Sequence, residues 1–126
     1  QMIWWNWKQK KDLMINSRTK GKVAELEVVN LFKNAGYNDS HRSQQFKGTK
    51  ESADIIIPRL DKIYQFEVKR REQIGKLDEW LQKTDKEAGE EKVPIVIHRR
   101  NGEPWKVTLL LTDWITGVKG IYPPNE

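Results

Sequence analysis

The sequence predicts an α/β domain in which a central mixed β-sheet is flanked by α-helices. Apolar residues recur at helical spacing over residues 17–35 and 74–88, and shorter runs rich in β-branched and aromatic residues lie between and after these segments. The resulting order is a helix, three strands, a second helix and two strands. At 126 residues without cysteine, the chain has a single-domain length and needs no disulfide framework.

The first helix is expected to begin near residue 17 and to end at Gly36. Glu25 is unusual in this helix, because Val28, Val29 and Phe32 follow it at i+3, i+4 and i+7 and place it on the apolar face. A carboxylate on such a face is costly unless it is paired or bound to a metal.

Three strands are expected next, over residues 37–45, 53–57 and 63–69, with a short turn over residues 58–62. The last two of these strands would form a hairpin.

The most informative motif is Glu67-Val68-Lys69 in the third strand. Alternate residues of a strand share a face, so Glu67 and Lys69 should point together. Asp54, which precedes three isoleucines, would lie beside them in the hairpin. Taken alone, the Glu67 and Lys69 pair is most often an ordinary ion pair on a solvated strand. Together with Asp54 and Glu25, it predicts a site that binds Mg²⁺ or Mn²⁺ and hydrolyses phosphodiesters.

The second helix is expected to end at Gly89, and two strands should follow over residues 93–98 and 105–111, joined by an Asn-Gly turn. Residues 121–124 are expected to be irregular. Trp80 and Trp105 lie in apolar patterns and are predicted in the core.

Residues 1–16 are aromatic and basic and are predicted to form an arm in front of a single domain over residues 17–126. The arm could stack tryptophans on bases with lysines on phosphates. Packing against its own or a neighbouring subunit is the favoured alternative, because exposed tryptophans normally seek burial. Trp114 is predicted either to cap the core or to lie in a dimer contact.

The net charge of +5 and the pI of about 9.4 favour a polyanionic partner. No apolar run approaches the roughly 20 residues of a membrane helix, so a cytoplasmic protein without a membrane partner is expected. The candidate contacts to nucleic acid are basic and amide side chains: Arg18, Lys20, Lys22, Arg42, Gln44, Gln45, Lys47, Lys50, Arg70, Arg71 and Gln82.

With these residues in view, the chain resembles the PD-(D/E)XK nuclease superfamily. Asp54 matches the motif aspartate and Glu67-Val68-Lys69 the (D/E)XK element, although Ala53 replaces the proline. The run Lys20-Gly21-Lys22-Val23-Ala24-Glu25, followed by Arg42, resembles more narrowly the archaeal and phage Holliday junction resolvases. The likeness covers about residues 17–111.

The resemblance implies a restriction-endonuclease-like fold with a five-stranded mixed sheet. It implies Mg²⁺-dependent hydrolysis of DNA, with Mn²⁺ as a substitute, and a homodimer that nicks opposed strands of a four-way junction. Glu25, Asp54, Glu67 and the Val68 carbonyl would be metal ligands. Lys69 would act in catalysis with the three carboxylates.

Other functions are also compatible with the sequence. Another nuclease of the same superfamily could be a restriction-type endonuclease, a repair nicking enzyme or an exonuclease. A non-catalytic nucleic-acid-binding module or a structural chromatin-like protein would use the basic charge without the acidic residues.

Overall fold

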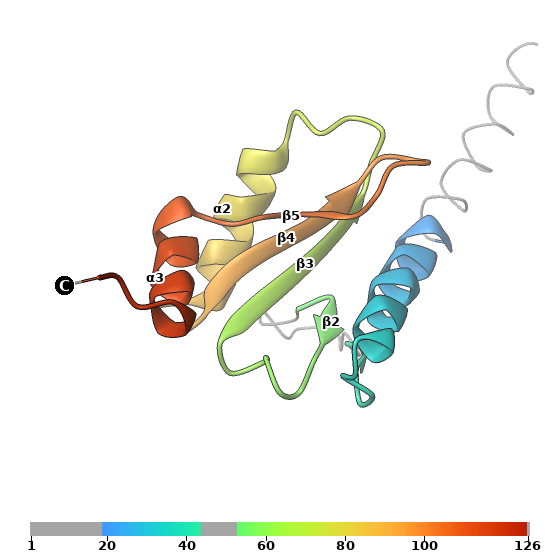
Figure 1. Ribbon diagram of the computed structural model, residues 1–126. Helices are drawn as coiled ribbons and strands as arrows, with labels where there is room; N and C mark the ends of the chain where they lie inside the picture. The colour runs from blue at the N-terminus through green and yellow to red at the C-terminus, as the bar shows by residue number, and fades with distance from the viewer. Residues whose placement is uncertain (1–18, 44–52, 126) are drawn as a thin grey trace, which may run out of the picture.

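The computed structural model describes residues 19–43 and 53–125, and these residues form an α/β fold (Figure 1). The first element is the N-terminal helix, residues 19–34. The other elements are β1 (His41–Arg42), β2 (Ile55–Ile56), β3 (Tyr64–Arg70), α2 (Leu77–Ala88), β4 (Val93–Arg99), β5 (Lys106–Thr108) and α3 (Leu111–Ile121).

The strands fall into two sheets. β3, β4 and β5 form a mixed sheet in that order, with β3 parallel to β4 and β4 antiparallel to β5. β1 and β2 form a separate antiparallel pair. The five-stranded sheet that the resemblance implies is therefore not found within residues 19–43 and 53–125.

A backbone hydrogen bond joins the two sheets. The Asp54 N–H donates to the Phe66 carbonyl at 3.1 Å. The next donor on this edge of β3, the Val68 N–H, is bonded by the Asp54 side chain at 2.8 Å. The Asp54 side chain thus occupies the position where the next backbone hydrogen bond of a ladder would lie, which is why the ladder of the expected hairpin does not continue along β3.

The main core lies between the N-terminal helix and one face of the β3–β4–β5 sheet. Its buried members are Ala24, Val28, Val29, Ile55, Ile57, Phe66, Val68 and Ile97. α2 packs on the opposite face and buries Leu81, Thr84 and Ala88. Because side chains alternate along a strand, β3 directs Phe66 and Val68 into the main core and directs Glu67 and Lys69 towards α2.

Several element boundaries are confirmed, but within the described residues three strands are shorter than expected: β1, β2 and β5. Gly36 and Gly89 follow the first two helices with φ of 108° and 67°, a left-handed conformation that glycine adopts without strain. The strand expected over residues 37–45 begins only at His41. Tyr37 starts a turn instead, and its carbonyl accepts bonds from both the backbone N–H and the hydroxyl of Ser40.

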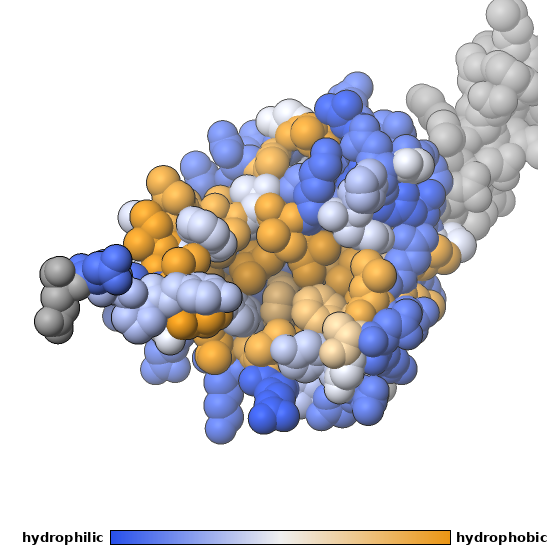
Figure 2. Space-filling view, viewed as in Figure 1, coloured by the Kyte–Doolittle hydropathy of each residue, from blue (hydrophilic) through white to orange (hydrophobic). Residues whose placement is uncertain are grey.

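α3 was not expected from the sequence, which predicted a strand to residue 111 and an irregular tail. β5 ends at Thr108, and the apolar residues beyond it follow a helical period. α3 buries none of its residues, and Leu111, Trp114 and Ile121 are 68%, 55% and 72% exposed. Figure 2 shows apolar atoms gathered over α3 and the adjoining sheet.

No helix in the described part of the chain has the length and apolar character needed to cross a membrane.

Candidate active site

The candidate site is built around the middle of β3, where Asp54 is fixed against the strand. The Asp54 Oδ2 accepts a hydrogen bond from the Val68 N–H at 2.8 Å, and the Asp54 N–H is bonded to Phe66. Two bonds on one edge of β3 therefore hold this carboxylate next to the Glu67-Val68-Lys69 motif.

Glu67 and Lys69 lie on the face of β3 that α2 covers. Glu67 is 5% exposed, and its Oε1 lies 3.2 Å from the Lys69 Nζ. The Lys69 Nζ also lies 5.9 Å from the centre of the Trp80 ring on α2, a cation–π distance. The expected same-face pair is confirmed, and its partial burial distinguishes it from a solvated surface ion pair.

The electrostatics of Asp54 show that negative charge is concentrated here. Burial and then the nearby Glu67 raise the pKa of Asp54 from 3.8 to about 7, although the bond from Val68 opposes the shift. Glu25 raises this pKa further and Lys69 lowers it. The other three polar residues of the predicted site therefore all influence the Asp54 carboxyl group.

Glu25 reaches towards this site from the N-terminal helix but is engaged by a cation. Its Oε2 accepts a hydrogen bond from the Arg42 Nε at 2.8 Å. This ion pair provides the partner that a carboxylate on an apolar helix face requires.

The Val68 carbonyl shares the edge of β3 that Asp54 occupies. In an extended strand the N–H and C=O of one residue point to the same side. Since the Val68 N–H is bonded by Asp54, its carbonyl also lies on this edge, away from β4.

A divalent ion would have two carboxylates and one carbonyl at this place. Among the residues described, no group of three or more acidic or histidine side chains is close enough to hold a metal ion. Mg²⁺, however, is often bound through only one or two carboxylates together with water and substrate phosphate. Asp54 and Glu67 fit that requirement, because their mutual repulsion, visible in the raised pKa of Asp54, would be relieved by a cation.

Glu87 is a site residue that the sequence reasoning missed. It is half-buried on α2, and its pKa is raised by burial and then by Glu67, while Lys83 and Lys69 oppose the shift. The signal was present in the sequence, because Glu87 follows Trp80 and Thr84 by seven and three residues and so shares their helix face.

The remaining predicted contacts are dispersed. Lys20, Lys22 and Gln82 are exposed, and Lys20 lines a pocket with Arg70 and Arg71. Arg18, Gln44, Gln45, Lys47, Lys50 and the arm over residues 1–16 lie outside the described residues.

Asp54, held beside the strand that carries Glu67 and Lys69, resembles the site of a nuclease of the PD-(D/E)XK type. A family model described as "Phage putative PDDEXK endonuclease" matches residues 16–120. The chain belongs to this family, and the superfamily resemblance is confirmed. No curated protein and no solved structure matches the chain.

Proposed function

We propose that this nuclease is a Mg²⁺-dependent DNA endonuclease that prefers four-way junctions and nicks their opposed strands. The observation that carries the metal dependence is the Asp54 carboxylate, fixed at 2.8 Å on the Val68 N–H beside the buried Glu67. Two adjacent carboxylates and a lysine are suited to phosphodiester hydrolysis assisted by a divalent ion.

Each residue of the site would have a distinct role. Asp54, Glu67 and the Val68 carbonyl would hold Mg²⁺ or Mn²⁺, which supplies Lewis acidity towards the phosphate and lowers the pKa of the attacking water. The Lys69 Nζ, which lies 3.2 Å from the Glu67 Oε1, would stabilise the negative charge that develops on the phosphate oxygens. Glu25 would join the metal site when Arg42 turns to the DNA.

Junction preference is the narrower part of the proposal. It rests on the resemblance of the segment from Lys20 to Glu25, with Arg42, to resolvases. A small domain also has little material for reading base sequence, so recognition of DNA shape and backbone is the natural mode. The second candidate is a nuclease of the same superfamily without junction preference.

Cleavage of a set of labelled substrates tests the proposal. We expect a four-way junction to be cut at least about tenfold faster than duplex, flap and single-stranded DNA of the same sequence, a difference of about 1.4 kcal/mol in the barrier. EDTA should abolish cleavage, and Mg²⁺ or Mn²⁺ should restore it. Equal rates on all substrates would support the second candidate, whereas binding without cleavage would identify a non-catalytic module.

A homodimer is proposed because nicks in two opposed strands require two symmetry-related sites. In this proposal α3, which carries exposed apolar residues, would supply the surface that contacts a second copy of this chain. In an antiparallel pair about Thr116, Leu111 would face the partner's Ile121, Trp114 the partner's Val118, and Ile115 the partner's Gly117. Apolar residues would meet apolar or small residues throughout, which would cover the exposed face of α3.

Sedimentation analysis of a charge-inserted variant tests this dimer. The wild-type protein should have twice the 14.9 kDa mass of one chain. Leu111→Glu combined with Ile121→Glu should give a folded monomer that nicks junctions on only one strand at a time. Thr112→Glu, on the polar side of α3, should remain dimeric. A monomeric wild-type protein at tens of micromolar would contradict the dimer.

A further inference from the structure

A basic pocket, separate from the candidate active site, lies at the C-terminal end of β3. A pocket of about 250 Å³ is lined by Lys20, Arg70, Arg71, Glu72 and Asn101. These residues come from the N-terminal helix, from β3 and the segment after it, and from the turn between β4 and β5. Three cations face one carboxylate there, so the pocket is suited to an anion.

The Arg70 guanidinium is fixed from two sides. Its Nε donates to the Asn101 Oδ1 at 2.8 Å, and its Nη1 forms an ion pair with the Glu27 Oε1 at 3.9 Å. The Asn101 backbone N–H is in turn bonded by Glu72 at 3.1 Å. A guanidinium has five N–H donors in a planar fork, so this anchoring leaves further donors for a ligand.

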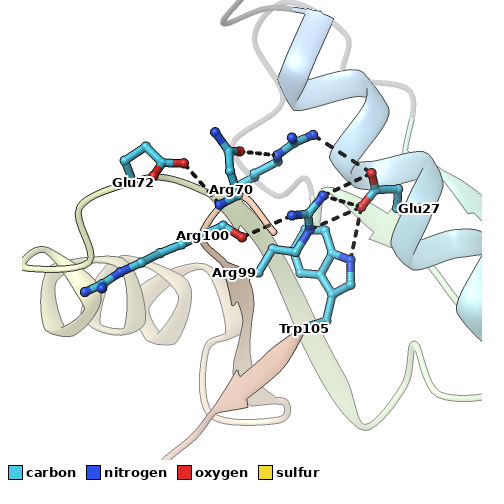
Figure 3. Close-up of polar contacts among 7 residues, drawn as sticks. Glu27, Arg70, Glu72, Arg99, Arg100 and Trp105 are labelled. Carbon is cyan, nitrogen blue, oxygen red and sulfur yellow. Dashed lines mark hydrogen bonds and ion pairs between the residues drawn. The ribbon is translucent and has the colours of Figure 1, made fainter. Parts of the chain in front are cut away.

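Glu27 is itself oriented by the sheet (Figure 3). Its Oε2 accepts hydrogen bonds from the Arg99 Nη2 at 3.0 Å and from the Trp105 Nε1 at 3.2 Å. Arg99 also lies 5.1 Å from the centre of the Trp105 ring. The Glu27 Oε1 accepts a further hydrogen bond from the Arg99 Nη2 at 3.2 Å and also lies 3.9 Å from the Arg70 Nη1. Glu27 therefore ties the N-terminal helix to β4 and to the residue before β5, and its carboxylate is held beside Arg70.

We propose that this pocket binds a backbone phosphate of the DNA substrate, next to the phosphate that is cleaved. Lys20, Arg70 and Arg71 are the contacts, and Glu27 and Asn101 are positioning residues that present Arg70. Arg70 directly follows Lys69 in β3, and its side chain points to the opposite face of the sheet. The DNA strand would therefore cross the end of β3 from the catalytic face towards the N-terminal helix.

This inference rests on the proposed function, because it assigns the pocket to the phosphate backbone of the same DNA substrate. A phosphate matches it better than a base, since planar guanidinium forks and ammonium groups are the usual partners of phosphate oxygens. The contact should contribute affinity without sequence preference.

The salt dependence of junction binding, measured by fluorescence anisotropy in EDTA, tests the contacts. Lys20→Gln combined with Arg70→Gln should weaken binding about tenfold and reduce the slope of log K against log[salt] by about 2. Arg59→Gln combined with Lys62→Gln removes the same charge from the exposed turn between β2 and β3. This control should change the slope by less than about 0.5.

The positioning role of Glu27 is tested by whether its replacement weakens or tightens DNA binding. Removing a negative charge near DNA should tighten binding if the residue acts only through its charge. If Glu27 positions Arg70, Glu27→Gln should instead weaken binding about threefold, and this loss should vanish in the Arg70→Gln background. Glu103→Gln, in the exposed turn between β4 and β5, is the matched control and should not weaken binding.

The outcomes separate this inference from the proposed function. A wild-type protein that neither binds nor cuts any DNA would overturn the nuclease proposal. A wild-type protein that binds and cuts, combined with an unchanged salt slope in the Lys20 and Arg70 double variant, would overturn the phosphate pocket alone. A Glu27→Gln variant that binds as tightly as the wild type would overturn the positioning role.

Discussion

Asp54→Asn is expected to lower the rate of junction cleavage at least about 1,000-fold while junction binding in EDTA stays within about twofold. The amide oxygen of asparagine can still accept the bond from the Val68 N–H, which is 2.8 Å long in the wild type. The substitution therefore removes the charge that would hold the metal and leaves the local geometry intact. Unchanged cleavage in this variant would exclude Asp54 from the mechanism.

The same substitution should stabilise the protein at about pH 8. Burial and Glu67 raise the pKa of Asp54 from 3.8 to about 7, so the folded state binds this proton more tightly than the unfolded state does. The contribution of Asp54 to the stability of the wild type must then fall as the pH rises through this range. Since one pKa unit corresponds to about 1.4 kcal/mol, Asp54→Asn should gain on the order of 2–4 kcal/mol above that range and about none below it.

Urea unfolding at about pH 4, 6 and 8 measures this difference. Mn²⁺ at the highest pH should stabilise the wild type by binding only its folded state, and it should have a much smaller effect on Asp54→Asn. A variant whose stability parallels that of the wild type at every pH would show that no electrostatic strain is stored at Asp54.

Lys69→Met is the second substitution with a large expected effect. Methionine keeps much of the apolar stem, but the ammonium that lies 3.2 Å from Glu67 is lost. Cleavage should fall about 100- to 1,000-fold, because in the proposed mechanism this cation stabilises charge that develops in the transition state. The buried Glu67 would also lose its partner, so stability should fall by about 1–3 kcal/mol.

Lys83→Met is the matched control for this experiment. Lys83 is exposed on α2 and lies 3.8 Å from Glu87, so the same charge is lost close to the site. Its cleavage rate should stay within about threefold of the wild type. If Lys69→Met, shown by circular dichroism to be folded, cuts as fast as this control, Lys69 has no catalytic role.

The parts of the fold that the sequence predicts are those with local signals. β3 and β4 are continuous apolar-rich runs, and Gly36 and Gly89 mark helix ends whose φ values favour glycine. α3 could not be predicted in this way. Three consecutive leucines favour a strand, and two glycines in the helix lower its intrinsic propensity.

The candidate site also has residues that sequence patterns predict and contacts that they do not predict. The Glu67 and Lys69 pair follows from strand alternation, and Glu25 and Glu87 follow from helix periodicity. The contacts of Glu27 do not follow from any pattern, because Arg99 and Trp105 lie 72 and 78 residues away in the chain. The hydrogen bond between the Asp54 side chain and the Val68 N–H takes the place of a backbone bond on this edge of β3. This contact depends on the tertiary structure, so local residue spacing does not predict it.

The alternation along β3 makes the length of this strand more critical than the identity of most of its residues. Inserting one residue before Glu67 would exchange the two faces for the rest of the strand and send its carboxylate among the apolar side chains of the N-terminal helix, while Val68 would take the place beside α2. Evolutionary variation in chain length should therefore be confined to the turns on either side of β3.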